Sequence, residues 1–107
     1  MLKKALKIKR EEYMPVIQAR KSVDSSTVRL SYTQTSGLSK FTVTVPKKAF
    51  LLATDRNKVK RLIFSFIEAE YSTIKPGFRG VFSVKKGFSR KNIEDIRVLL
   101  KKGNAYL

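Results

Sequence analysis

The sequence predicts an α+β fold in which helices pack on a small sheet. Three observations predict it: a 3.6-residue apolar period in some segments, a two-residue period in others, and turn residues between them. The chain has 107 residues, 42% of them hydrophobic, with seven Phe and four Tyr. This length suits a single domain spanning residues 1–107, with enough apolar surface to bury one core.

The first predicted helix covers residues 11–19. Tyr13, Val16 and Ile17 share one face of it, and its acidic start suits the positive end of a helix dipole. Pro15 is acceptable only in the first turn, where the missing N–H costs no hydrogen bond.

Two strands follow, in the segments around Val28–Thr33 and Phe41–Val45. Apolar and polar residues alternate in both, and β-branched residues are frequent. Ser36 and Gly37 provide the turn between them, and Pro46 ends the second strand. The pattern indicates an antiparallel pair.

A long helix is predicted from a cap at Thr54 or Asp55 to about Tyr71. Its core stripe repeats every three or four residues and consists of Val59, Leu62, Ile63, Phe66 and Ile67. The opposite face carries mostly charged or polar residues together with Phe64. Phe64 could stack on a nucleic acid, meet a protein partner or fold back onto Lys60.

A third strand is predicted at residues 79–86, after the break at Pro76 and Gly77. Ser89 then begins a last helix, which we expect to end at Gly103. The order that periodicity alone predicts is therefore α-β-β-α-β-α.

The charge of the chain indicates a polyanionic partner. Twenty-four Lys and Arg against eight Asp and Glu give a formal net charge of +16, spread along the whole sequence. A compact domain with this charge repels itself unless an anion such as nucleic acid binds it. The alternative is a highly charged surface with no such partner, but solubility needs a net charge of only about 2 to 8.

The composition excludes several classes of site. Cys and His are both absent from the sequence, which excludes disulfides, zinc fingers and Cys- or His-based nucleophile systems. The acids offer no convincing two-metal site, so we expect no catalytic and no metal-binding residue. The apolar runs are too short to span a membrane and the first residues do not resemble a secretory signal, so we expect a cytoplasmic protein.

One basic motif stands out. Lys47 and Lys48 are followed, after seven residues, by a run at the start of the long helix that reads Arg56-Asn57-Lys58-Val59-Lys60-Arg61. Arg and Lys clustered at one helix start form a phosphate-binding edge, and Arg can also stack on bases. An isolated string of this kind is more often a solvated helix face. The preceding lysine pair and the strand–helix–strand context favour RNA binding.

This motif resembles the signature of the bacterial ribonuclease P protein component, a strand ending in Lys-Lys followed by a helix that opens R-N-R-x-K-R. Residues 41–46, residues 81–87 and residues 11–17 resemble the flanking parts of the family in the same order. Four departures are Lys58 in place of Arg, Phe64 where another Arg is usual, and Thr42 and Phe50 in place of small residues. A fifth is Ile17 in place of an aromatic residue.

The resemblance implies a mixed sheet in α-β-β-β-α-β-α order with a left-handed βαβ crossover. A further strand would then lie near residues 21–26 or within residues 28–35. It also implies a protein subunit that binds ribonuclease P RNA and precursor tRNA, as a monomer in the complex, while Mg²⁺ and the active site belong to the RNA. The implied RNA-binding residues are Lys47, Lys48, Arg56, Asn57, Lys58, Lys60 and Arg61.

The implied cleft for the single-stranded 5′ leader of precursor tRNA would use Tyr13, Ile17 and Tyr32. Tyr13 and Ile17 could equally be core residues, and Tyr32 is the weakest candidate. A ribosomal or other structural RNA-binding protein is the main alternative function. A DNA-binding architectural protein is disfavoured because the sequence has no helix-turn-helix or zinc motif.

Overall fold

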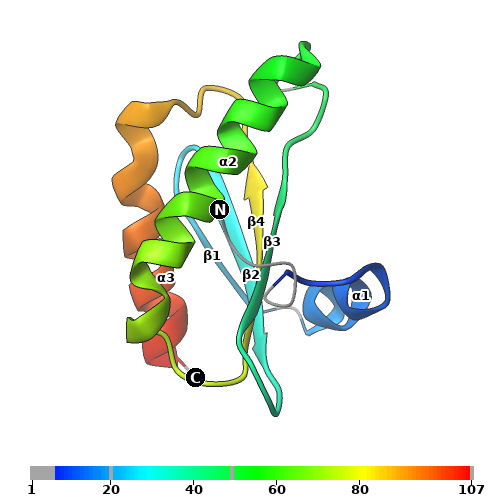
Figure 1. The fold of residues 1–107 in the computed structure, drawn as a ribbon, viewed down its shortest axis with the longest axis vertical. Helices are drawn as coiled ribbons and strands as arrows, with labels where there is room; N and C mark the ends of the chain where they lie inside the picture. Colours follow the sequence, from blue (N-terminus) through cyan, green and yellow to red (C-terminus); the bar gives the residue numbers. More distant parts are fainter. Residues whose placement is uncertain (1–6, 20, 49, 107) are drawn as a thin grey trace.

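The computed structural model of the chain describes residues 7–19, 21–48 and 50–106. Its helices and strands are α1 (Arg10–Gln18), β1 (Ser22–Asp24), β2 (Val28–Gln34), β3 (Lys40–Thr44), α2 (Ala53–Glu70), β4 (Phe78–Val84) and α3 (Ile93–Tyr106). Figure 1 shows α2 and α3 on one face of the sheet and α1 on the other. The α+β class and the α-β-β-β-α-β-α order are confirmed.

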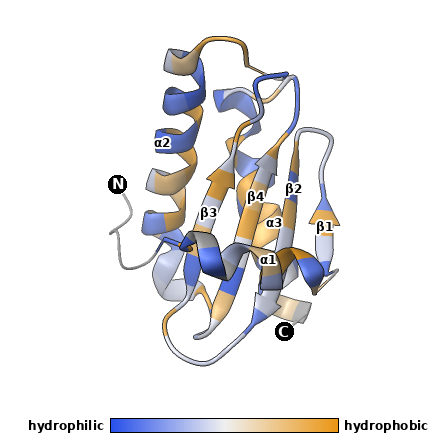
Figure 2. Ribbon diagram, turned by 90° about the vertical axis from the view of Figure 1, so that its right-hand side faces the viewer, coloured by the Kyte–Doolittle hydropathy of each residue, from blue (hydrophilic) through white to orange (hydrophobic). Residues whose placement is uncertain are grey.

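The four strands form one mixed sheet in the order β1-β2-β4-β3. β2 runs antiparallel to both β1 and β4, whereas β3 and β4 are parallel and are connected through α2. Seen from the α1 side in Figure 2, both parallel strands run upward and β4 lies to the right of β3, with α2 behind the sheet. The crossover is therefore left-handed, as the family resemblance implied and against the general preference for right-handed connections.

The strand that periodicity did not reveal is β1, at residues 22–24, near the first of the two expected places. It has only three residues, too few to display a period of two. It pairs with β2 so that Asp24 lies opposite Arg29, and Arg29 Nε donates to Asp24 Oδ1 at 2.9 Å. This hydrogen bond lowers the pKa of the Asp24 carboxyl below its usual value.

The main core lies between the sheet and the pair α2 and α3. Its centre is a group of aromatic rings in which Phe78 stacks on Phe41, with ring centroids 5.4 Å apart, and on Tyr32 at 6.0 Å. Two glycines give these rings their space. A Cβ at Gly80 would lie 2.9 Å from the Phe78 ring, and one at Gly103 would lie 3.0 Å from it.

The position of Gly103 corrects the predicted end of the last helix. Gly103 lies inside α3, which continues to Tyr106. Its lack of a side chain lets the helix approach Phe78 closely, so packing rather than chain reversal explains this glycine. The other end agrees better with the sequence, because Ser89 caps the 3₁₀ turn Arg90–Asn92 that leads directly into α3.

Two further local predictions were wrong. Pro15 lies in the second turn of α1, which begins at Arg10, so the helix forgoes one backbone hydrogen bond there. Neither Thr54 nor Asp55 caps α2, because the helix begins earlier, at Ala53. Leu52 occupies the cap position, and its side chain makes no capping hydrogen bond.

The described residues contain no helix that is both long enough and apolar enough to cross a membrane.

Candidate nucleic-acid interface

The lysine pair of the basic motif lies on an exposed turn directly after β3. Lys47 and Lys48 are both exposed, and the turn closes where the Phe50 amide donates to the Pro46 carbonyl at 3.2 Å. The chain then reaches Leu51 and Leu52, two largely exposed apolar residues, before α2 begins. The turn therefore brings the lysine pair to the same end of the molecule as the start of α2.

Arg56 connects this turn to the helix. Its Nη1 donates to the carbonyl of Phe50 at 2.9 Å and to that of Leu51 at 3.1 Å, and the side chain is half-buried. These bonds hold the loop before α2 against the first turn of the helix. The Arg56 guanidinium thus bonds two backbone carbonyls of the loop, a contact that the sequence did not reveal.

The other motif residues diverge around α2. Asn57 and Lys60 line a groove of about 410 Å³ that lies between α2, β3 and residues 7–8. Lys58 lines a second groove of about 530 Å³ on the side of α2 that faces the turn into α3, and Arg61 borders both. We name these the α2–β3 groove and the α2–α3 groove. The basic motif therefore forms a ridge with a groove on each side.

Phe64 is not on a solvent face of α2. It is only 7% exposed and belongs to the main core, and Lys7 Nζ lies 4.8 Å from the centroid of its ring. Residues 7 and 8 cover this position because they run alongside β3, where the Ile8 amide donates to the Phe41 carbonyl. A helical wheel drawn for α2 alone omits this covering segment, which explains why Phe64 appeared to lie on the charged face.

The second predicted site is the α1 face of the sheet. Tyr13 and Ile17 are half-buried on α1, and Val16 between them is buried. A small hollow of about 210 Å³ lies between α1 and the sheet, lined by Glu11, Pro15 and Val16 of α1 and by Thr33, Thr35 and Arg79; neither Tyr13 nor Ile17 lines it. This surface is polar and partly basic, since Lys40, Thr42 and Ser83 also occupy strand positions on this face.

Tyr32 does not belong to this face. Its side chain is 5% exposed and lies in the main core, where it stacks on Phe78 beneath α2 and α3. The predicted contact of Tyr32 with a leader strand is therefore wrong. Its alternation with Val28 and Leu30 placed it on the apolar face, which is the opposite face of the sheet from Tyr13.

The acidic residues that the structure pairs lie away from the motif. Arg97 of α3 forms ion pairs with Glu70 at 3.1 Å and Glu94 at 3.2 Å, and Asp95 accepts a hydrogen bond from Thr27. Among the described residues there is no group of three or more His, Cys, Asp or Glu arranged to hold a metal ion. Between Lys47 and Arg61 the sequence has one acidic residue, Asp55, so the ridge combines high positive charge with little acid, an arrangement suited to phosphate groups.

Sequence reasoning missed two basic residues beside the ridge. Lys7 precedes the first helix in a basic part of the sequence, and nothing in the sequence placed it against α2. Arg90 follows the cap residue Ser89, and the structure brings it to the α2–α3 groove, more than 25 residues after the motif. The basic turn at residues 85–87 was the one signal near Arg90.

Comparison with known proteins gives one family. The family model described as Ribonuclease P matches residues 2–105. The solved structure of the Staphylococcus aureus RNase P protein is 19% identical, covers 92% of this chain and 94% of its own, and superimposes with a TM-score of 0.77. No curated protein gives a significant match.

A second solved structure, the RNase P protein from Thermotoga maritima, is also 19% identical. The alignment covers 94% of this chain and 96% of that one, with a TM-score of 0.71. At this level of identity the two likenesses establish the fold over nearly the whole chain.

The hydrogen bonds of Arg56 lead to a prediction about stability. Arg56→Gln should lower the free energy of unfolding by about 1–2 kcal/mol, because it removes charged hydrogen bonds to two loop carbonyls. Arg61→Gln is the matched control. It removes the same charge from the same helix, but the Arg61 side chain makes no hydrogen bond or ion pair with the described part of the chain, so the change in stability should be less than about 0.5 kcal/mol. Urea denaturation measures both. Equal midpoints for the two variants would contradict the structural role of Arg56.

Proposed function

The chain belongs to the ribonuclease P protein family, and on that premise we propose that it binds the RNA subunit of ribonuclease P and the 5′ leader of precursor tRNA. In this proposal the protein supports endonucleolytic 5′ maturation of tRNA, while the RNA subunit carries the active site and the Mg²⁺ ions. The single observation that carries the proposal is the ridge of the basic motif, exposed at the start of a helix whose other side is buried in the core.

The ridge suits an RNA backbone for physical reasons. Lys47, Lys48, Lys58 and Arg61 are exposed around one end of the molecule, with Lys60 half-exposed among them. Each can neutralise a phosphate, which releases condensed counterions and favours binding. Because α2 is anchored by Val59, Ile63 and Ile67, Lys58, Lys60 and Arg61 project from a rigid element rather than a mobile tail, so these three gain little order on binding.

The leader would bind on the other face of the sheet, at α1. Tyr13 and Ile17 are half-exposed on α1, whose Glu11, Pro15 and Val16 line a hollow together with Arg79 of the sheet, so a single strand could place a base against α1 and a phosphate near Arg79. Single-stranded RNA is commonly bound in this way, by base stacking together with backbone contacts.

A structural RNA-binding protein without a role in cleavage is the competing function. It would share the ridge, but it would have no need of a cleft for a leader on the opposite face. Stimulation of cleavage by a ribonuclease P RNA therefore separates the two functions.

The first test removes two cations from the ridge. The double variant Lys60→Gln, Arg61→Gln should reduce stimulation of precursor-tRNA cleavage by a bacterial ribonuclease P RNA at limiting Mg²⁺ by about tenfold or more, because two charge-assisted contacts are lost. Excess Mg²⁺ should restore part of the activity. Arg56 is left unchanged so that the loop before α2 stays in place.

The matched control for this test is Lys101→Gln, Lys102→Gln, which removes the same charge from exposed positions of α3. It should stimulate cleavage almost as well as the wild type. Equal loss in both double variants would mean that only net charge matters, and failure of the wild type to stimulate any such RNA would favour the competing function.

The second test concerns the leader. Tyr13→Ala should weaken binding of leader-bearing precursor tRNA to the assembled enzyme by about fivefold or more, the order expected for one lost base stack. Binding of mature tRNA should not change, and Tyr13→Phe should behave like the wild type because it keeps the ring. If Tyr13→Ala instead lowers the melting temperature and weakens both ligands alike, Tyr13 is a packing residue only.

A further inference from the structure

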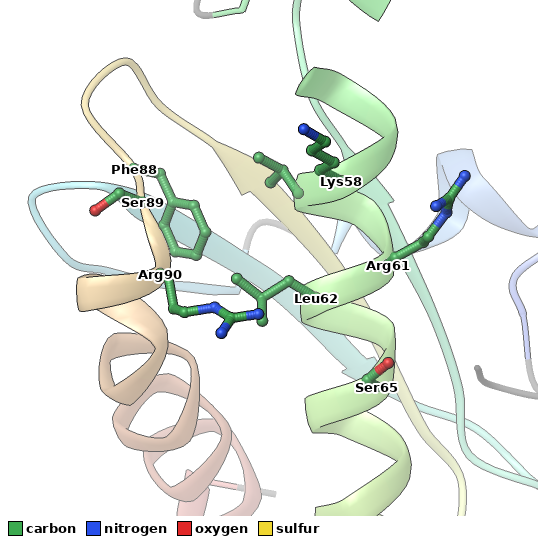
Figure 3. Close-up of a pocket in the computed structure, with 8 residues that line it drawn as sticks. Lys58, Arg61, Leu62, Ser65, Phe88, Ser89 and Arg90 are labelled. Carbon is green, nitrogen blue, oxygen red and sulfur yellow. The ribbon is translucent and has the colours of Figure 1, made fainter. Parts of the chain in front are cut away.

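The α2–α3 groove is not explained by phosphate binding along the ridge. It has a volume of about 530 Å³, within the range of about 300–1,000 Å³ typical of small-molecule sites. Figure 3 shows it between α2 and the turn that leads into α3, with Lys58 and Leu62 on the helix and Phe88, Ser89 and Arg90 on the turn. It lies on the α2–α3 side of the sheet, opposite α1.

The groove has two chemically different parts. Its inner wall is apolar and consists of Val59 and Phe88, both buried, and the half-buried Leu62. Its margins are cationic: Lys58 is exposed on one side and Arg90 on the other. In Figure 3 the Arg90 side chain reaches across toward Leu62, whereas Arg61 points to the other side of α2. Among the described residues that line the groove, none is acidic.

These two parts match the two parts of a nucleotide. A phosphate backbone alone would make no favourable contact with the apolar wall. An apolar ligand alone would make no ion pair with the two flanking cations. An unpaired nucleotide needs both, since its base has apolar faces and its phosphate is anionic. A guanidinium such as that of Arg90 can stack flat on a base, while Lys58 suits the phosphate as a point charge.

We propose that the α2–α3 groove binds one unpaired nucleotide of the RNA partner, with the base between Arg90 and the apolar wall and the phosphate at Lys58. This inference rests on the proposed RNA-binding function and extends the interface beyond the motif to the turn before α3. The site is distinct from the leader cleft, because it lies on the other side of the sheet.

The direct test compares three probes on isotope-labelled protein by NMR: a single-stranded RNA hexamer, an RNA duplex of the same length and inorganic tripolyphosphate. The hexamer should shift the amides of residues 58–62 and 88–90 at concentrations where the duplex and tripolyphosphate shift them much less. Equal shifts with all three probes would show a phosphate patch only and would overturn the nucleotide site. Shifts confined to the α1 face would overturn it as well.

A matched pair of variants separates the groove from general charge. Arg90→Gln should weaken hexamer binding by about fivefold or more, because a base stack is lost. Lys91→Gln removes the same charge from the next residue, which is exposed and does not line the groove, and should weaken it by about twofold or less. Equal effects of the two variants would overturn the proposal.

Cleavage assays with the same two variants distinguish this inference from the proposed function. One outcome is that the wild type stimulates a ribonuclease P RNA and that Arg90→Gln and Lys91→Gln stimulate it to the same extent as each other. The groove is then not part of the interface, and the proposed nucleotide site is wrong. The proposed function as a protein subunit would still stand. If Arg90→Gln alone loses stimulation and retains the wild-type melting temperature, the groove site is supported in the assembled enzyme.

Discussion

The packing of Phe78 is the constraint on which the rest of the structure depends. Its ring lies between Phe41 and Tyr32, and it is approached so closely by Gly80 and Gly103 that neither position has space for a side chain. This arrangement joins the strands β2, β3 and β4 to α3, which packs on the face of the sheet formed by these rings. The parallel neighbours β3 and β4 are connected through α2, which packs on the same face of the sheet as α3.

The position of α2 determines which surface of the protein carries the positive charges of the basic motif. Because Val59, Ile63 and Ile67 face the core, the cations between them in sequence must lie on the outer surface of the helix. Some of the acidic residues form ion pairs away from this surface: Asp24 pairs with Arg29, and two glutamates pair with Arg97 of α3. Part of the net charge of +16 therefore lies on one cationic ridge, which has a groove on each side.

Periodicity predicted most of the fold because each long element buries one face. It identified both long helices and three of the four strands in their chain order. The predicted antiparallel pairing of the strands around residues 28–33 and 41–45 was wrong, because β4 lies between β2 and β3 in the sheet. Periodicity could not show the short strand β1 or the handedness of the crossover, since neither has a signal in local sequence; the family resemblance supplied both expectations. Gly103 was misread because a glycine near a helix end suits a cap and a close helix–sheet contact equally well.

The site was predicted less completely, for reasons of tertiary structure. The motif residues surround the start of α2 as expected, but Arg56 also holds the preceding loop, and that contact depends on a backbone path that sequence does not reveal. Phe64 and Tyr32 are in the core because segments distant in sequence cover them. Arg90 reaches the groove only because the turn before α3 folds toward α2.

The central claim is that the ridge binds RNA through phosphate contacts made from the start of α2 and from the turn before it. The most direct measurement is the dependence of ribonuclease P RNA affinity on KCl concentration, for the wild type and for a variant with Lys47, Lys48, Lys60 and Arg61 all replaced by Gln. Each phosphate contact contributes about 0.7–0.9 to the log–log slope, so the variant should have a slope smaller by about three. A variant with the wild-type slope would contradict the account, because the RNA would then contact some other surface.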